Sequence, residues 1–89
     1  MTAPIVKRTA AFSETAIDGE VVVMDLDRGD FFSLTGTAVA IWHKIDGTRS
    51  RSALIAELAE EYARPHGEVT VDVDAFLAQL KTAGLIDGC

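Results

Sequence analysis

The stretch from Asp30 to Ile45, DFFSLTGTAVAIWHKI, decides how the chain folds. Its first part, Phe31 to Leu34, is a short apolar run that predicts a strand. A polar break at Thr35-Gly36-Thr37 follows, where either threonine can cap a helix. The apolar residues after the break have the i, i+3, i+4, i+7 spacing of one buried helix face: Ala38, Ile41, Trp42 and Ile45. We therefore expect a strand that runs almost directly into a buried helix.

Two further strands are predicted upstream of this stretch. Ala11 to Ile17 alternates weakly, and Glu20 to Leu26 (EVVVMDL) is rich in β-branched residues. Asp18-Gly19 is a two-residue hairpin turn, and Asp27 to Asp30 forms the second turn. The more apolar face of the middle strand carries Val22, Met24 and Leu26. Strands joined by short turns form an antiparallel meander, so the third strand, Asp30 to Leu34, has one free edge.

Two helices are predicted downstream. The first, RSALIAELAEEYA, follows a cap at Ser50 or Ser52 and ends before Pro65. Its buried stripe consists of Leu54, Ile55, Leu58, Ala59 and Tyr62. The second runs from about Val71, after a cap at Thr70, to Ala83, and Gly84 ends it. Its buried face carries Val73, Phe76, Leu77 and Leu80, and Leu85 and Ile86 return to the core.

Three strands followed by three helices predict an α+β fold that resembles a winged helix-turn-helix. The 89 residues are enough for one small domain. We expect residues 1–8 to be a flexible N-terminal arm and residues 9–87 to form a single domain. Apolar runs are too short for a membrane helix and no signal-peptide pattern is found, so we expect a cytoplasmic protein.

The charge pattern disfavours nucleic acid as a partner. Formal net charge is -6, from 14 acidic and 8 basic residues, and the basic residues are scattered. In a DNA-binding helix-turn-helix the last helix would enter the major groove, but here it carries Asp72 and Asp74, with Lys81 as its cation. An acidic winged-helix regulator that binds DNA or a protein partner is therefore kept as an alternative and not as the main hypothesis.

Residue patterns for catalysis are missing from the sequence. His43 and His66 have no neighbours at metal-ligand spacing, and no glycine-rich phosphate loop is present. Cys89, the single cysteine, is the last residue and has no adjacent base. We therefore expect neither an enzyme nor a bound metal or cofactor. A free strand edge next to an apolar helix is instead a place where an extended peptide can add as a strand.

The order of several short motifs resembles the PqqD-like family, the RiPP recognition elements, between about Val21 and Ile86. These motifs are Asp27-Arg28-Gly29, Phe32-x-Leu34, Thr37-Ala38, Ile41-Trp42, Asp46-Gly47-Thr48, Leu58, Tyr62, Asp72-Val73, Phe76-Leu77, Leu80 and Gly84-Leu85-Ile86. Thr35 stands where many members have asparagine. The resemblance implies a non-catalytic domain that holds the leader of a ribosomally made precursor peptide as an added strand, between the third strand and the third helix.

Carried over by position, the resemblance predicts a peptide-binding set on these two elements. Its members are Asp30, Phe31, Phe32, Ser33, Leu34, Asp72, Val73, Phe76, Leu77, Leu80 and Lys81. Core packing is the competing role for the aromatic residues, and it is favoured for Phe32, Leu77 and Trp42, since so small a domain needs them. For Asp30, Asp72 and Asp74 the competing role is turn formation and helix capping.

Implied partners are the precursor leader peptide and a modifying enzyme, such as a leader peptidase, a cyclase or a radical enzyme, in lasso-peptide-type or PQQ-type biosynthesis. Another alternative is a structural subunit of a larger enzyme, in which a partner permanently covers the free edge. A homodimer paired through the same edge is also compatible with the sequence.

Overall fold

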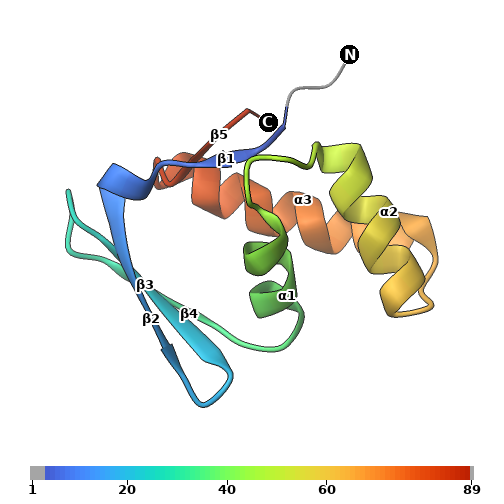
Figure 1. The fold of residues 1–89 in the computed structure, drawn as a ribbon, viewed down its shortest axis with the longest axis horizontal. Coiled ribbons are helices and arrows are strands. Elements are labelled where there is room, and N and C mark those ends of the chain that lie inside the picture. Colours follow the sequence, from blue (N-terminus) through green and yellow to red (C-terminus); the bar gives the residue numbers. More distant parts are fainter. Residues whose placement is uncertain (1–3, 89) are drawn as a thin grey trace.

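The computed structural model describes residues 4–88. Three antiparallel strands form one sheet in the order β2-β3-β4: β2 (Phe12–Ile17), β3 (Glu20–Asp25) and β4 (Phe31–Leu34) (Figure 1). Asp18 and Gly19 both have positive φ, at 49° and 81°, as the predicted two-residue turn between β2 and β3 requires. The predicted meander is confirmed.

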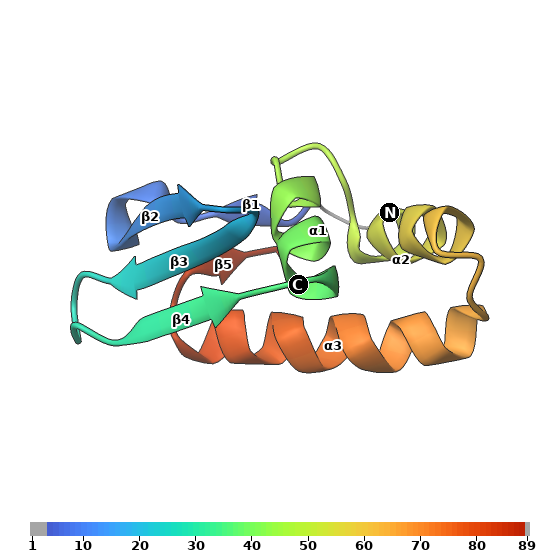
Figure 2. The same ribbon diagram turned by 90° about the horizontal axis from the view of Figure 1, so that it is seen from below.

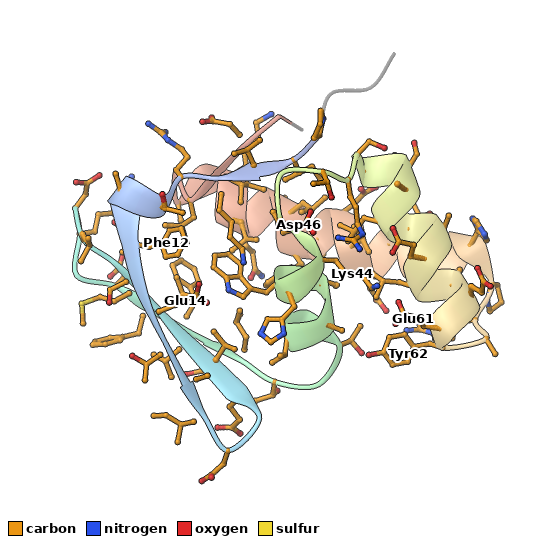
Figure 3. The ribbon with its side chains drawn as sticks, in the orientation of Figure 1. Phe12, Glu14, Lys44, Asp46, Glu61 and Tyr62 are labelled. Atoms are coloured by element: carbon orange, nitrogen blue, oxygen red, sulfur yellow. The ribbon has the colours of Figure 1, made fainter. Side chains whose placement is uncertain are left out.

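Three helices follow the sheet, α1 (Thr37–Lys44), α2 (Arg51–Glu61) and α3 (His66–Thr82). Figure 2 shows α3 in one layer, with α1 and α2 in the layer above it and β4 beside the C-terminal half of α3. The α+β fold class is therefore as predicted. Lys44 of α1 and Glu61 of α2 face each other, with Nζ and Oε2 2.6 Å apart (Figure 3).

The core lies between the sheet and the helices. Trp42 is completely buried, and its ring meets Phe12 edge to face at a centroid distance of 5.2 Å. On β3 the buried face is the one with Val21, Val23 and Asp25, and the more apolar face is left partly open. The neighbouring strands explain this choice, since Phe12 pairs with Asp25 and Leu34 with Val21, which puts their large apolar side chains on the same face.

The predicted start of α3 at Val71 is wrong, because the helix begins at His66. Pro65 is the N-cap residue in an extended conformation, and Thr70 lies inside the helix, where its hydroxyl donates to the carbonyl oxygen of His66 at 2.7 Å. Burial of Val69, which is 4% exposed, stabilises this additional N-terminal turn and outweighs the unfavourable Gly67 within it.

The caps of the other helices are partly as predicted. Ser50 caps α2, and its hydroxyl accepts a hydrogen bond from the Ala53 amide at 3.2 Å. At α1 neither threonine caps, because Gly36 occupies the N-cap position with φ 56° and ψ -124° and no side chain bonds the free amides. Tyr62, expected in the buried stripe of α2, is 47% exposed because the helix ends at Glu61.

Residues 5–7 contact the domain, in contrast to the flexible arm expected for residues 1–8, of which residues 1–3 lie outside the described part of the chain. Ile5 is 1% exposed, and β1 (Val6–Lys7) pairs antiparallel with β5 (Ile86–Asp87). A 3-10 turn (Thr9–Ala11) then leads into β2. Burial of the apolar Ile5 holds this segment on the domain. The chain returns at Leu85 and Ile86 and supplies a strand with which the segment pairs, so it is tied down as a loose arm would not be.

Candidate functional site

One edge of β4 has no strand beside it within the described part of the chain. The amide of Asp25 donates to the carbonyl of Asp30 at 2.8 Å, so these two residues face each other across β3 and β4. Backbone groups of an antiparallel pair alternate in direction along each strand. Phe32 and Leu34 therefore bond toward β3, whereas Phe31 and Ser33 direct their N–H and C=O groups to the free edge.

A groove separates this edge from α3. At the β3–β4 turn this groove forms a cavity of about 380 Å³. Its lining residues are Asp25, Arg28, Asp30, Phe32, Ala78, Gln79, Thr82 and Ala83. Helical spacing puts Gln79 and Ala83 on the same side of α3 as Asp72 and Phe76, so this side of the helix is about 16 Å long. An extended segment of about five residues has that length.

Several predicted site residues lie on β4 or on the side of α3 next to the cavity. Asp30 and Phe32 line the cavity, and Ser33 is exposed at the strand edge. Phe76 is partly buried and packs against the core. Asp72 is exposed on the same side of α3, where it forms an ion pair with Arg64 at 3.0 Å. The structure therefore brings both predicted elements together around one groove.

Other predicted residues are in the core and present no surface to a peptide in this conformation. Leu34 and Leu77 are each 4% exposed, and Val73 and Leu80 are completely buried. They form the floor that holds β4 and α3 together. Buried apolar side chains of this kind pack within the core and are not available to anchor a guest.

Two predicted residues point elsewhere. Phe31 is 64% exposed, and strand alternation puts its side chain on the outer face of the sheet, away from α3. Lys81 is exposed and shares the opposite flank of α3 with Asp74, seven residues earlier. Asp74 itself makes a double hydrogen bond to Arg51 of α2, at 2.6 and 2.7 Å, which lowers the pKa of its carboxyl group. That flank is therefore occupied by a contact between helices.

Sequence reasoning missed six of the eight residues that line the cavity. Asp25 ends β3 and Arg28 lies in the β3–β4 turn, and the other missed residues lie at the C-terminal end of α3: Ala78, Gln79, Thr82 and Ala83. Alternation groups Asp25 with Val21 and Val23, but the other face of β3 is the more apolar one, so alternation alone did not indicate that Asp25 points inward. The small side chains on α3 gave no signal either, since alanine is common on any helix.

No group of three or more potential metal ligands occurs among residues 4–88. In the same part of the chain, none of the helices has the length and apolar character needed to cross a bilayer.

Fold and groove together define a class of small α+β domains, in which three strands and three helices leave one strand edge open beside the last helix. The family model for Coenzyme PQQ synthesis protein D (PqqD) matches residues 20–86, and the chain belongs to this family. Among solved structures it is similar to "TbiB1 in Complex with the TbiA(beta) Leader Peptide", with a TM-score of 0.79 and 25% sequence identity over 100% of this chain and 98% of that chain. No curated protein matches the chain in sequence.

Proposed function

We propose that the protein captures the leader of a ribosomally made precursor peptide as an additional strand on β4, and presents the remainder of the peptide to a modifying enzyme. The observation that carries this proposal is the open β4 edge, with outward backbone groups at Phe31 and Ser33 and a cavity between the start of β4 and the end of α3. The similar solved structure, a complex with a leader peptide, supports it.

Main-chain hydrogen bonds supply the affinity in this proposal. A five-residue guest strand adds about four or five of them, each with a net contribution of about 0.5–1.5 kcal/mol. Such bonds recognise an extended backbone of any sequence, so the groove beside α3 must supply the choice of peptide. We expect a dissociation constant in the micromolar range or below, or about −8 kcal/mol.

The proposed role is binding without catalysis, and the reaction belongs to a partner enzyme such as a peptidase, a cyclase or a radical enzyme. No observation favours the regulator that binds DNA. Asp72 and Asp74 lie on α3, the helix that would read bases, and both form ion pairs with arginines of the same chain.

Fluorescence anisotropy with a fluorescein-labelled leader peptide of a ribosomally made precursor tests the proposal. Ser33→Pro removes one outward N–H without disturbing the β3–β4 ladder, and should abolish binding. Ala16→Pro is the matched control, because Ala16 occupies the equivalent outward position on the free edge of β2. Binding that survives Ser33→Pro, or is lost equally in Ala16→Pro, would show that β4 is not the site.

A further inference from the structure

The cavity at the β3–β4 turn contains a carboxylate that the fold itself does not fully use. Asp25 is 2% exposed and is the one buried charged residue of the described chain. Its Oδ1 accepts hydrogen bonds from the amides of Asp27 and Arg28, at 2.9 and 3.3 Å, and this closes the turn. Within residues 4–88 no partner is found for Oδ2.

That second oxygen faces the cavity. Every side-chain polar atom that is completely shielded from solvent in the described chain has a hydrogen-bond partner. Oδ2 is therefore not sealed in the core, and the opening next to it is the cavity that Asp25 lines. A nearly buried carboxylate oxygen with open space in front of it is a strong acceptor with a capacity for one more donor.

The surroundings select a basic donor. Asp30 adds a second carboxylate at the cavity and Arg28 one guanidinium, so the formal charge of the lining is negative. Arg28 forms no ion pair with either aspartate in the described structure and leaves both available. Phe32, Ala78 and Ala83 provide an apolar wall for a long aliphatic stem.

Strand geometry determines which guest residue enters. Phe32 and Asp30 are two positions apart on β4 and point to the same side of the sheet, toward α3. On a guest strand paired with β4, the residue opposite Asp30 points to that side as well. Its side chain therefore extends into the cavity.

We propose that this cavity is a specificity subsite for a lysine or arginine side chain of the bound peptide, with Asp25 and Asp30 as its recognition residues. The inference rests on the proposed function, because the guest strand must lie on β4. The subsite would make the groove select a basic residue at one position of the peptide, whereas backbone pairing alone does not distinguish between side chains.

Selection of a displayed library of random dodecapeptides on the full chain tests this subsite. Enrichment of lysine or arginine at one position, next to apolar residues, is expected. A fluorescein-labelled copy of the most enriched peptide should bind about ten-fold more weakly when that basic residue is replaced by norleucine, which keeps the stem and removes the charge.

The Asp25→Asn variant connects this preference to the cavity. Asparagine retains the Oδ1 acceptor that closes the turn but presents an amide N–H to the guest, so the preference for lysine over norleucine should disappear. Asp18→Asn, at the other end of the sheet, changes the net charge by the same amount and should retain the preference for lysine over norleucine. If Asp25→Asn fails to fold by circular dichroism, the exposed Asp30→Asn should reduce the preference about three-fold.

Two failures are distinguishable. If peptides lose binding to the Ser33→Pro variant but show no preference for a basic residue, the subsite is overturned and strand addition still holds. The same conclusion follows if the preference for lysine over norleucine persists in the Asp25→Asn and Asp30→Asn variants. Absence of any peptide whose binding depends on Ser33 would overturn both proposals.

Discussion

The indole Nε1 of Trp42 donates a hydrogen bond to Oε2 of Glu14 at 2.7 Å. Trp42 is completely buried in α1, whereas Glu14 comes from β2, the edge strand farthest from β4 (Figure 3). Lys7 covers the same ring, with its Nζ 4.2 Å from the ring centroid. These contacts hold the sheet in place against the helices.

Removal of the acceptor should therefore destabilise the domain. Glu14→Ala leaves a buried N–H without a partner, and we expect a loss of about 1–3 kcal/mol in the free energy of unfolding, measured in urea. Glu14→Gln retains a carbonyl acceptor and should lose less. The control is Glu20→Ala at the exposed hairpin. A similar loss of stability in that variant would contradict a specific stabilising role for the hydrogen bond between Trp42 and Glu14.

Gly36 connects β4 to α1 in a conformation that side chains disfavour, with φ 56° and ψ -124°. A Cβ atom there would meet nothing within 4 Å, so any cost of Gly36→Ala comes from the backbone alone. We expect a loss of about 1–3 kcal/mol in thermal or chemical unfolding.

Gly67 provides the opposite control. It lies in the first turn of α3 at an ordinary φ and also has open space around it. Gly67→Ala should stabilise the protein by about 0.4–1 kcal/mol, because alanine restricts the unfolded chain. Equal effects of the two substitutions would mean that backbone conformation does not explain them.

Phe31 and Phe32 should contribute differently to peptide binding. Phe32 lines the groove, so Phe32→Ala should lower leader affinity about ten-fold, by anisotropy. Phe31 points to the outer face, where its side chain is 64% exposed, and Phe31→Ala should change affinity by no more than about two-fold. A larger effect at Phe31 would show that peptides use the outer face.

Stability should fall in acid through three carboxylates. Hydrogen bonds from Thr48 and Arg49 lower the pKa of Asp46 to about 2, Arg49 lowers the pKa of Glu57, and Arg51 lowers that of Asp74. Because each pKa is lower in the folded state, the unfolded chain binds protons first as the pH decreases. Their stabilisation is complete above about pH 5 and is lost as the pH falls toward about 2.

Thermal unfolding across this pH range measures the effect. The midpoint temperature should decrease steadily below about pH 5. Arg49→Gln removes the main partner of Glu57, so its midpoint should be lower at neutral pH and should change less on acidification. An unchanged slope in this variant would contradict the role of the Arg49 contacts.

Much of the fold was predictable because its signals are local. The hairpin turn at Asp18-Gly19, the β-branched run of β3 and the spacing of Ile41, Trp42 and Ile45 each determine a structure within a few residues. The start of α3 was not predictable in this way. Pro65 and Gly67 resemble a loop, and burial of Val69 against distant elements makes the segment helical.

For the candidate site, the sequence by itself predicted a strand with one open edge and no recognisable catalytic motif, and the family resemblance added α3 as the second element. Only the tertiary structure decided which side chains face the groove. It buried Val73, Leu77 and Leu80, directed Phe31 outward, and brought Asp25 to the last turns of α3. Periodicity defines which residues share a face, but which face is covered depends on packing between segments far apart in the chain, and that information is not local.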